Sequence, residues 1–253
     1  MKTTMEGIER ALEGKKHFFF DVDGTLVRSH ALIDPSMLAT LMELQKRGNT
    51  VTVVSGSNLA YIEKSIPDIW KKEYCNFSAL PTHGNVAYDE EGRILWNRPL
   101  TWRQKLEIFQ YISNVLEKAG LTYPDANDLV QDRGSQIAFS IYGHDAPLAE
   151  KEKVDPDLSK RKELLSKFPF RSETVEVKIG GTTNFDFIAK GFNKGRNIRD
   201  FITLPQYHWR PEECVYFGDR LQEGGNDDTV IGVIDTIPVK GPEDCERILR
   251  EML

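Results

Sequence analysis

The stretch HFFFDVDGTL, residues 17–26, decides how the rest of this chain is interpreted. Three consecutive phenylalanines, Phe18 to Phe20, favour a strand that is buried on both faces. Asp21 and Asp23 follow at once, and carboxylates at the end of a buried strand repel each other and are costly to desolvate. Either the strand ends at the surface, or a positive charge lies between these two side chains.

The length and charge of the chain argue against several classes of protein. Its 253 residues suffice for one large domain or two smaller ones. The net charge is −6 and no long basic block is present, so nucleic acid is not expected as a partner. No apolar run reaches the length of a membrane span, and residues 1–14 are too polar and acidic for a signal peptide. Cys75, Cys214 and Cys245 match no metal-binding spacing, which favours reduced thiols and a cytoplasmic location.

Strands and helices alternate in the first and last parts of the chain. Asp34 and Pro35 supply an N-cap and a proline at the first position of a helix. The β-branched run 50–54 predicts a second strand, and the runs 214–217 and 230–234 predict two more. Strand, helix and strand with short joins indicate a parallel sheet with right-handed crossovers. The predicted fold class is therefore α/β, with a Rossmann-like parallel sheet as its core.

The middle third of the chain follows a different pattern. Runs at 85–88 and 93–96 flank a turn of acids and glycine, which predicts a hairpin. Thr101 and Gln104 form a capping box before an amphipathic helix. We expect one apolar face of this helix to lie in a core, the face made of Trp102, Leu106, Phe109, Ile112 and Leu116. The chain is therefore predicted to hold a discontinuous α/β core domain and an inserted α+β domain, with bounds 1–82 and 189–253 for the core and 83–188 for the insertion.

Polar residues follow three of the predicted strands. They are Asp21 and Asp23 after the first strand, Ser55 after the second, and Asp219, Asn226 and Asp227 after the strand at 214–217. Because parallel strands all point the same way, their carboxyl ends meet at one edge of the sheet, where ligands bind. Oxygen ligands without a nearby histidine or cysteine favour Mg²⁺ over zinc. A divalent cation would also offset the repulsion between the clustered carboxylates.

The order of these motifs resembles that of the haloacid dehalogenase-like phosphatases and phosphotransferases. Four motifs of that family are matched along the chain: Asp-x-Asp-Gly-Thr at 21–25, a strand-terminal hydroxyl at Ser55, a lysine at Lys194, and Gly-Asp with Asn-Asp at 218–219 and 226–227. The insertion between the second and third motifs is similar to the type C2 cap of the family. The resemblance covers nearly the whole chain and implies an Mg²⁺-dependent enzyme that acts on a small phosphorylated substrate.

The resemblance also implies a role for each matched residue. Asp21 would be the nucleophile that carries a covalent aspartyl-phosphate, and Asp23 would protonate the leaving oxygen and then activate water. Asp21, the main-chain carbonyl of Asp23 and Asp219 would bind Mg²⁺. Ser55 and Lys194 would contact the phosphoryl oxygens.

Other matched residues would surround these groups: Asn226 and Asp227 would orient the metal ligands, and Gly24, Thr25 and Gly56 would lie near the substrate. Lys190 is a second lysine that could bind the phosphate. Lys194 is favoured because it opens a predicted helix, as the lysine of the family does.

Several local features resemble the phosphomannomutase branch of the family, among them 81–88, Gly180-Gly181 before 185–187, and the fourth motif, in which 217–219 is followed by 224–227. A mutase binds a sugar with a phosphate at either end, so its cap needs a second phosphate clamp, which arginine supplies best. Arg133 matches one arginine of that branch, but His144 occupies the position of another, and an upstream arginine falls near 126–127, where this chain has Ala-Asn. Asp186 could bind a sugar hydroxyl, and Asn184 replaces the serine beside it.

Because arginines of the second phosphate clamp are missing from this chain, a sugar bisphosphate bound in the reversed orientation would be held poorly. Water would then compete for the phosphoryl group. We therefore expect a phosphatase that hydrolyses a small phosphorylated metabolite, a sugar phosphate being favoured. The alternative is a phosphomannomutase that uses a hexose bisphosphate. A non-enzymatic sensor is disfavoured because every motif acid is present. The mutase branch pairs through its caps, so a homodimer through the inserted domain is a further expectation.

Overall fold

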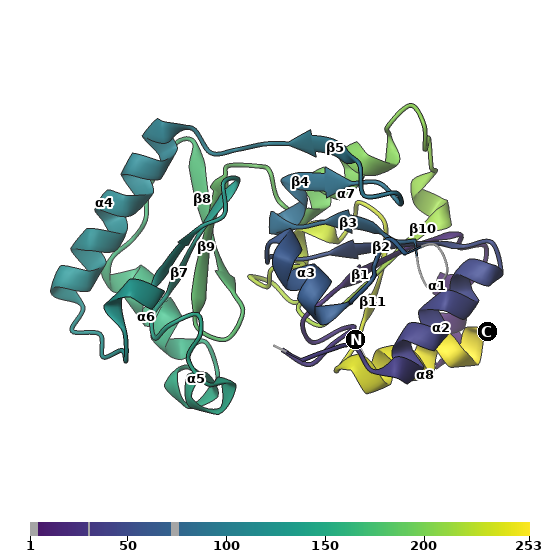
Figure 1. Cartoon of the computed structure of the whole chain (residues 1–253), viewed down its shortest axis with the longest axis horizontal. Helices are drawn as coiled ribbons and strands as arrows, with labels where there is room; N and C mark the ends of the chain where they lie inside the picture. The colour runs from purple at the N-terminus through teal and green to yellow at the C-terminus, as the bar shows by residue number, and fades with distance from the viewer. Residues whose placement is uncertain (1–4, 30, 72–75) are drawn as a thin grey trace. The chain divides into compact units, whose positions relative to one another are not determined.

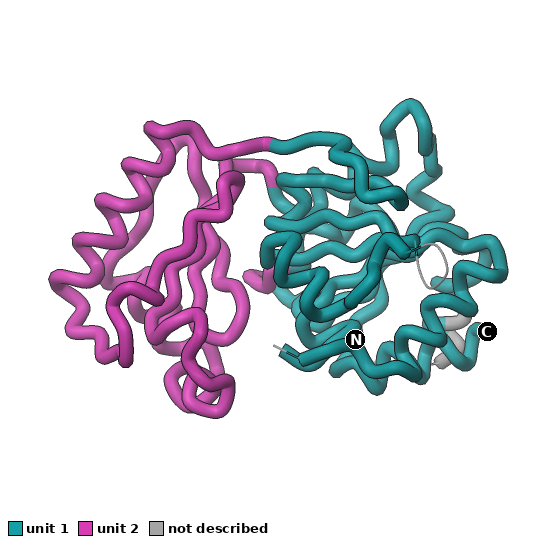
Figure 2. The backbone as a smooth tube through the Cα atoms, in the orientation of Figure 1, with its two compact units in different colours: residues 1–97, 193–223, 227–253 teal, residues 98–192, 224–226 magenta. Residues whose placement is uncertain are grey.

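The computed structural model describes residues 5–29, 31–71 and 76–253. The chain folds into two compact units (Figures 1 and 2), the first comprising residues 1–97, 193–223 and 227–253 and the second residues 98–192 and 224–226. Among the described helices, none is both long and apolar enough to cross a membrane. Cys214 and Cys245 are buried free thiols, and burial raises the pKa of both, whereas Cys75 lies outside the described residues.

The first unit is built around a seven-stranded sheet in the order β11-β10-β1-β2-β3-β4-β5. Its strands are β1 (His17–Asp21), β2 (Thr50–Val54), β3 (Ser78–Leu80), β4 (Val86–Tyr88), β5 (Ile94–Asn97), β10 (Cys214–Gly218) and β11 (Asp235–Pro238). Its α-helices are α1 (Met5–Leu12), α2 (Pro35–Lys46), α3 (Leu59–Ser65), α7 (Lys194–Ile202) and α8 (Pro242–Met252). Short 3-10 turns are η1 (Thr82–Gly84), η3 (Pro211–Glu213) and η4 (Asp228–Val230). Strands β11, β10, β1, β2 and β3 are parallel, which confirms the α/β class.

Strand β1 lies at the centre of the parallel strands because its three phenylalanines fill both faces of the sheet. Phe18 and Phe20 stack with Phe217 of β10 in the core on one face. Phe19 points to the opposite face, where its ring meets the edge of Phe201 in α7. Each of these buried rings contributes about 1.5–3 kcal/mol relative to an exposed one. This packing fixes the end of β1, where Asp21 lies.

Two helices of the first unit, α2 and α7, begin directly after residues that cap them. Asp34 accepts a hydrogen bond from the main-chain N of Ser36, so α2 starts at Pro35 as predicted. Asn193 accepts one from the main-chain N of Arg196, so α7 starts at Lys194. The lysine of the third motif is therefore held at the first turn of a helix.

The edges of the first unit differ from the sequence expectation in two places. Strands β4 and β5 form the expected hairpin, but β4 also pairs antiparallel with β3. The hairpin therefore extends the core sheet, and the units divide after Asn97 rather than after Thr82. The strand predicted at 230–234 is wrong: Gly232 adopts a φ of +80° and turns the chain there, and the last strand is β11.

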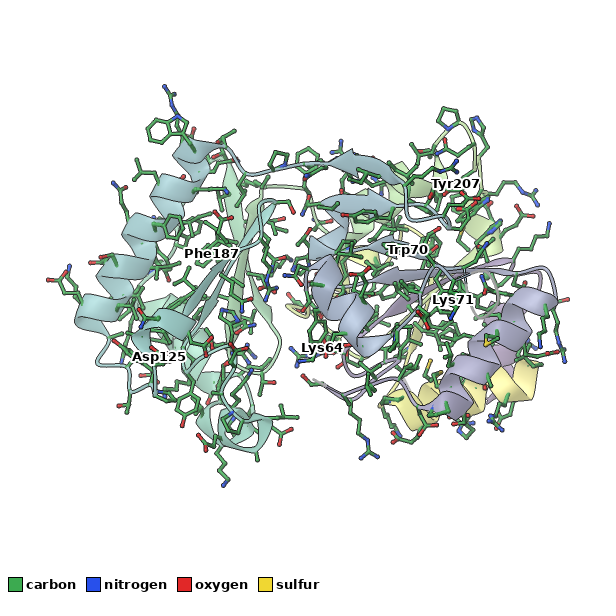
Figure 3. The ribbon with its side chains drawn as sticks, in the orientation of Figure 1. Lys64, Trp70, Lys71, Asp125, Phe187 and Tyr207 are labelled. Atoms are coloured by element: carbon green, nitrogen blue, oxygen red, sulfur yellow. The ribbon has the colours of Figure 1, made fainter. Side chains whose placement is uncertain are left out.

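The second unit contains a four-stranded antiparallel sheet in the order β6-β7-β9-β8. Its strands are β6 (Val130–Asp132), β7 (Gln136–Ser140), β8 (Val175–Gly180) and β9 (Asn184–Ala189), and its helices are α4 (Trp102–Lys118), η2 (Ala126–Asp128), α5 (Leu148–Val154) and α6 (Ser159–Lys167). One face of the sheet packs on α4 through an apolar core. Phe187, labelled in Figure 3, contributes to this core and meets the ring edges of Tyr111 and Phe170.

The capping box of α4 is confirmed, whereas the predicted buried face of this helix holds for Ile112 and Leu116 and is wrong for its other three residues. Thr101 and Gln104 exchange the expected hydrogen bonds. The buried stripe of the helix consists of Ile108, Ile112 and Val115. Three residues of the predicted face are instead exposed: Trp102 is 69% exposed, Leu106 44% and Phe109 41%. The helix therefore carries two apolar stripes that share Ile112. The sheet covers the stripe of β-branched residues, Ile108, Ile112 and Val115.

Candidate active site

The carboxyl ends of three parallel strands bring the predicted acids together. Asp21 is the last residue of β1 and lies opposite Val54 of β2, so Ser55 follows on one side. On the other side, Phe20 is paired with Phe217 of β10, so Gly218 and Asp219 follow there. The convergence that the strand order predicted is therefore present in the structure.

Three of these acids form a cluster that could hold a metal ion. One carboxylate oxygen from each of Asp21, Asp219 and Asp227 lies within 4.8 Å of the others. The Oδ1 atom of Asp219 is buried and has no hydrogen-bond partner. Buried carboxylates with an unpaired oxygen suit a hard divalent cation such as Mg²⁺, which takes oxygen ligands. The donor set therefore fits the Mg²⁺ site implied by the sequence.

Gly24 allows the first motif to approach this cluster. Its φ is +79°, and a Cβ atom there would lie 2.5 Å from Asp219 Oδ2. Thr25 follows with its Oγ1 buried and without a hydrogen-bond partner. Asn226 falls in the short segment grouped with the second unit, and its Oδ1 is also buried and unpaired.

Lys194 supplies a buried positive charge next to two of the acids. Its Nζ donates to Asp21 Oδ1 at 2.5 Å and to Asp227 Oδ1 at 2.7 Å. Tyr216, which the sequence analysis did not identify, donates from Oη to the same oxygen of Asp227 at 2.6 Å. Lys190 belongs to the second unit, where its main-chain N bonds to Thr174 O. Of the two candidate lysines, Lys194 is therefore the one that contacts Asp21.

The electrostatics of the cluster follow from its burial. Burial raises the pKa of Asp21 well above its ordinary value; Lys194 opposes the rise, and the carboxylates of Asp227 and Asp219 add to it. Burial likewise raises the pKa of Asp219 to about 6, with Arg220 opposing and Asp227 adding to the rise. For Lys194, burial disfavours the ammonium, but the two contacting carboxylates outweigh it and raise its pKa. A bound cation would offset the remaining repulsion between the acids.

Ser55 is buried and is held by main-chain bonds from a strained segment. Its Oγ accepts from the main-chain N of Ser57 at 3.0 Å, and its carbonyl accepts from the N of His83 at 2.7 Å. Thr82 and His83 both have left-handed backbones, with φ of +50° and +59°, a conformation that non-glycine residues rarely adopt. Gly56 lies in the same loop, between Ser55 and Ser57.

Asn197 links this strained segment to the helix that carries Lys194. Its Nδ2 donates to the carbonyl of His83 at 2.8 Å and to Asn85 Oδ1 at 3.3 Å. Gly84 packs so closely that a Cβ there would lie 2.7 Å from Asn197 Cβ. Asn197 was not predicted as a site residue, although its position three residues after Lys194 places both on one face of a helix.

Asp23 lies beside the cluster and has a partner that the sequence analysis also missed. Tyr61, on α3, donates a hydrogen bond from Oη to Asp23 Oδ1. The Asp23 main chain forms a bridge to Val27, and the N of Gly24 donates to the Val27 carbonyl at 2.8 Å. No regular sequence pattern marks Tyr61.

The remaining predicted residues lie in the second unit, and two of them, Asn184 and Asp186, are on strand β9. Asp186 is buried, and Gln136 donates from Nε2 to its Oδ1 at 2.7 Å. The Oε1 of Gln136 is buried without a hydrogen-bond partner, as is Asn184 Oδ1. Gln136 was missed, although its alternation with Ala138 and Ser140 on β7 is typical of residues opposite a core face.

His144 and Arg133 complete the predicted residues of the second unit. His144 is buried, and its Nε2 lies 3.3 Å from the Ala138 carbonyl. Burial lowers the pKa of His144, and the charge of Arg133 lowers it further. The Arg133 Nη2 donates to Gln131 Oε1 at 2.9 Å.

Comparisons with known proteins agree with this architecture. The model of a family described as haloacid dehalogenase-like hydrolase matches residues 18–227. The phosphomannomutase of Spinacia oleracea is 29% identical over 244 residues, which cover 92% of this chain and 94% of that protein. Among solved structures, the IMP-bound, N-terminally truncated IMP-nucleotidase of Plasmodium falciparum has a TM-score of 0.66 at 16% identity, with 97% of this chain and 70% of that chain covered.

A haloacid dehalogenase-like hydrolase from Bacteroides thetaiotaomicron has a TM-score of 0.61 at 13% identity, with 94% of this chain and all of that chain covered. At such identities these two structures show a common fold. The family match extends from β1 to Asp227 and so includes all four sequence motifs. The chain belongs to the haloacid dehalogenase-like hydrolases.

Proposed function

We propose that this chain is an Mg²⁺-dependent phosphatase that hydrolyses a small phosphorylated metabolite, a sugar phosphate, through an aspartyl-phosphate on Asp21. The observation that carries the proposal is the position of Asp21: it ends the central strand, contacts the Lys194 ammonium at 2.5 Å and belongs to a cluster of three carboxylates. An anionic phosphate approaches a carboxylate nucleophile only where positive charge offsets the repulsion.

The metal would be held by Asp21 and Asp219, with the Asp23 carbonyl added by the family resemblance, and Asp227, the third acid of the cluster, would orient these ligands. Bound there, Mg²⁺ would supply positive charge to the phosphoryl oxygens. Asp21 attacks phosphorus, and Asp23 donates its proton to the leaving oxygen as the P–O bond breaks. Lys194 and Ser55 hold the phosphoryl oxygens during transfer. Asp23 then takes a proton from the water that cleaves the aspartyl-phosphate.

The sugar part of the substrate is assigned to polar residues of the second unit. Asp186 would accept hydrogen bonds from sugar hydroxyls, because Gln136 fixes one of its oxygens. Asn184 Oδ1 is an unpaired acceptor that a hydroxyl could satisfy. Arg133 would add a cationic contact.

Phosphomannomutase is the second candidate, favoured by relatives such as that of Spinacia oleracea. A mutase must hold a second phosphate, and here the position of a clamp arginine is occupied by His144, whose lowered pKa keeps it neutral near pH 7. A neutral buried imidazole is a weak phosphate ligand, which supports hydrolysis over isomerisation.

The test is to incubate the protein and Mg²⁺ with mannose 1-phosphate, with and without a hexose bisphosphate. Release of free phosphate supports the phosphatase. Rapid, bisphosphate-dependent formation of mannose 6-phosphate would establish the mutase instead. The Asp21→Asn variant should retain its circular dichroism spectrum and lose turnover, and full activity in that variant contradicts both candidates.

A cytoplasmic location and a homodimer through the second unit also belong to the proposal. The spacing of the three cysteines, which favours reduced thiols, supports the first. The exposed Trp102, Leu106 and Phe109 on α4 support the second. Light scattering of the protein, with a Leu106→Glu variant for comparison, tests the dimer.

A further inference from the structure

The hydrogen bond between Tyr61 and Asp23 joins two segments of the first unit that are far apart in the sequence. Asp23 lies just after β1, in the first motif, and Tyr61 lies on α3, which begins shortly after the Ser55 loop. The phenol donates to one defined oxygen of the carboxylate, Oδ1. Lys64, labelled in Figure 3, lies further along the same helix.

Tyr61 is itself fixed in place. Asn58 caps α3 and accepts a hydrogen bond from the main-chain N of Tyr61 at 3.0 Å. The Tyr61 ring is partly buried and packs against the apolar core below the sheet. A donor that is anchored at both its main chain and its ring directs the group that it contacts.

The main chain at Asp23 does not depend on this bond. The Asp23–Val27 bridge and the bond from Gly24 N to Val27 O already close the turn. The phenol therefore orients the side chain of Asp23 rather than its main chain. Asp23 is the residue that the proposed function uses as acid and base.

We propose that Tyr61 is a positioning residue that holds Asp23 for proton transfer, an inference that rests on the proposed phosphatase function. The phenol binds Oδ1 and leaves Oδ2 to carry the proton. As the bond from phosphorus to the leaving oxygen breaks, the proton on Oδ2 passes to that oxygen and Asp23 becomes a carboxylate. When water attacks the aspartyl-phosphate, Oδ2 takes up the proton of the water. The Tyr61 proton stays on the phenol throughout.

A positioning role predicts that the effect of removing the Tyr61 hydroxyl depends on the leaving group, whereas general stabilisation of the fold does not. A leaving group that is a weak base departs without a proton, whereas a more basic one needs the acid. Removal of the Tyr61 hydroxyl should therefore slow the transfer from phenyl phosphate more than the transfer from p-nitrophenyl phosphate. The two esters are nearly equal in shape, so binding changes affect both alike.

The experiment compares kcat/KM of the unaltered protein and Tyr61→Phe on these two esters with Mg²⁺ present. We expect the ratio of phenyl to p-nitrophenyl phosphate activity to fall about tenfold, in keeping with partial loss of general acid catalysis. Tyr207→Phe is the matched control, because it removes a phenol that donates to a carboxylate, Glu90 Oε2 at 2.9 Å, on the same unit. In this control, the ratio of phenyl to p-nitrophenyl phosphate activity should stay within a factor of two of the ratio for the unaltered protein.

A double variant tests whether Tyr61 acts through Asp23. In an Asp23→Asn background, adding Tyr61→Phe should cost no further activity on phenyl phosphate, since the group that Tyr61 positions is already lost. An unchanged ester ratio in Tyr61→Phe, or a further tenfold loss in the double variant, overturns the inference while the phosphatase function stands. Absence of Mg²⁺-dependent turnover of both esters and of mannose 1-phosphate by the unaltered protein overturns the proposed function, and the inference with it.

Discussion

Replacing Asp219 by asparagine should stabilise the metal-free protein, although it removes a residue assigned to the Mg²⁺ site. Burial raises the pKa of Asp219 from 3.8 to about 6, so the folded chain disfavours its ionised form, and the side chain is only 23% exposed. At 1.36 kcal/mol for each pKa unit, ionising this group in the folded chain costs about 3 kcal/mol at neutral pH. Asparagine keeps the shape without the charge. We therefore expect the free energy of unfolding of Asp219→Asn to be about 2–3 kcal/mol higher at pH 7 in EDTA.

The pH dependence of this contribution has a definite sign. Between pH 3.8 and about 6 the folded chain keeps a proton on Asp219 that the unfolded chain has lost. More protons bound in the folded state means that the free energy of unfolding falls as pH rises through this window and levels off above it. In the Asp219→Asn variant the free energy of unfolding lacks this dependence on pH. The variant should therefore be only slightly more stable than the unaltered protein at pH 4 and should show the full difference at pH 7.

Urea denaturation followed by circular dichroism, at pH 4, 5, 6 and 7 in EDTA, measures both effects. Saturating Mg²⁺ should then stabilise the unaltered protein, by about 2.7 kcal/mol at one hundred times its dissociation constant, and should have little effect on the variant. Glu43→Gln, which removes an exposed carboxylate on α2, is the control and should change stability by less than about 0.5 kcal/mol. A loss of stability in Asp219→Asn at pH 7 in EDTA would refute the reasoning.

Three further substitutions test the packing around the site. Gly24→Ala should lower stability by about 1–3 kcal/mol more than Gly48→Ala, because both glycines have positive φ but only the first would bring a Cβ against a carboxylate; urea titration measures the difference. Asn197→Ala should cost about 1–3 kcal/mol and lower kcat, because it removes a hydrogen bond to the buried carbonyl of His83 and loosens the segment that holds the Ser55 loop; thermal melts and steady-state kinetics measure these effects. Ile112→Ala should cost about 2–5 kcal/mol and Phe109→Ala less than about 1 kcal/mol, because only the first side chain is in the core; urea titration of both variants decides this.

The control for Asn197→Ala is Gln45→Ala, which also removes a side-chain amide that donates to a main-chain carbonyl, that of Asn76 at 2.9 Å. Equal losses of kcat in the two variants would show that Asn197 has no special link to the site. Equal stability of Gly24→Ala and Gly48→Ala, or of Ile112→Ala and Phe109→Ala, would contradict the packing described for those positions.

Three of the five parallel strands, β1, β2 and β10, could be predicted from the sequence because each carries a local signal. The Phe18–Phe20 run, the β-branched run of β2 and the Asp34 cap each depend on a few neighbouring residues. The meeting of Asp21 and Asp219 followed from strand direction once their strands were taken as neighbours, and β1 and β10 are paired in the structure. These signals suffice for the acid cluster.

Other features depend on contacts between distant segments, which no local pattern records. The helix at 102–118 has two apolar stripes, and its sequence does not say which one the sheet will cover. Strands β4 and β5 look like any hairpin, and only the free edge of β3 makes them part of the core sheet. Tyr61 and Asn197 act through single hydrogen bonds to segments far along the chain, so their roles are visible only in the structure.

The position of β1 between β2 and β10 has a consequence for synthesis of the protein on the ribosome. Strands β1, β2 and β3 emerge first, whereas β10, which covers the other edge of β1, emerges only after residues 98–192 of the second unit. Until then, the phenylalanine-rich strand at the centre of the finished sheet is an open, apolar edge, the kind of surface that promotes aggregation and chaperone binding. The second unit can complete its own core in that interval, so the nascent chain should gain a folded insert before it gains a catalytic centre.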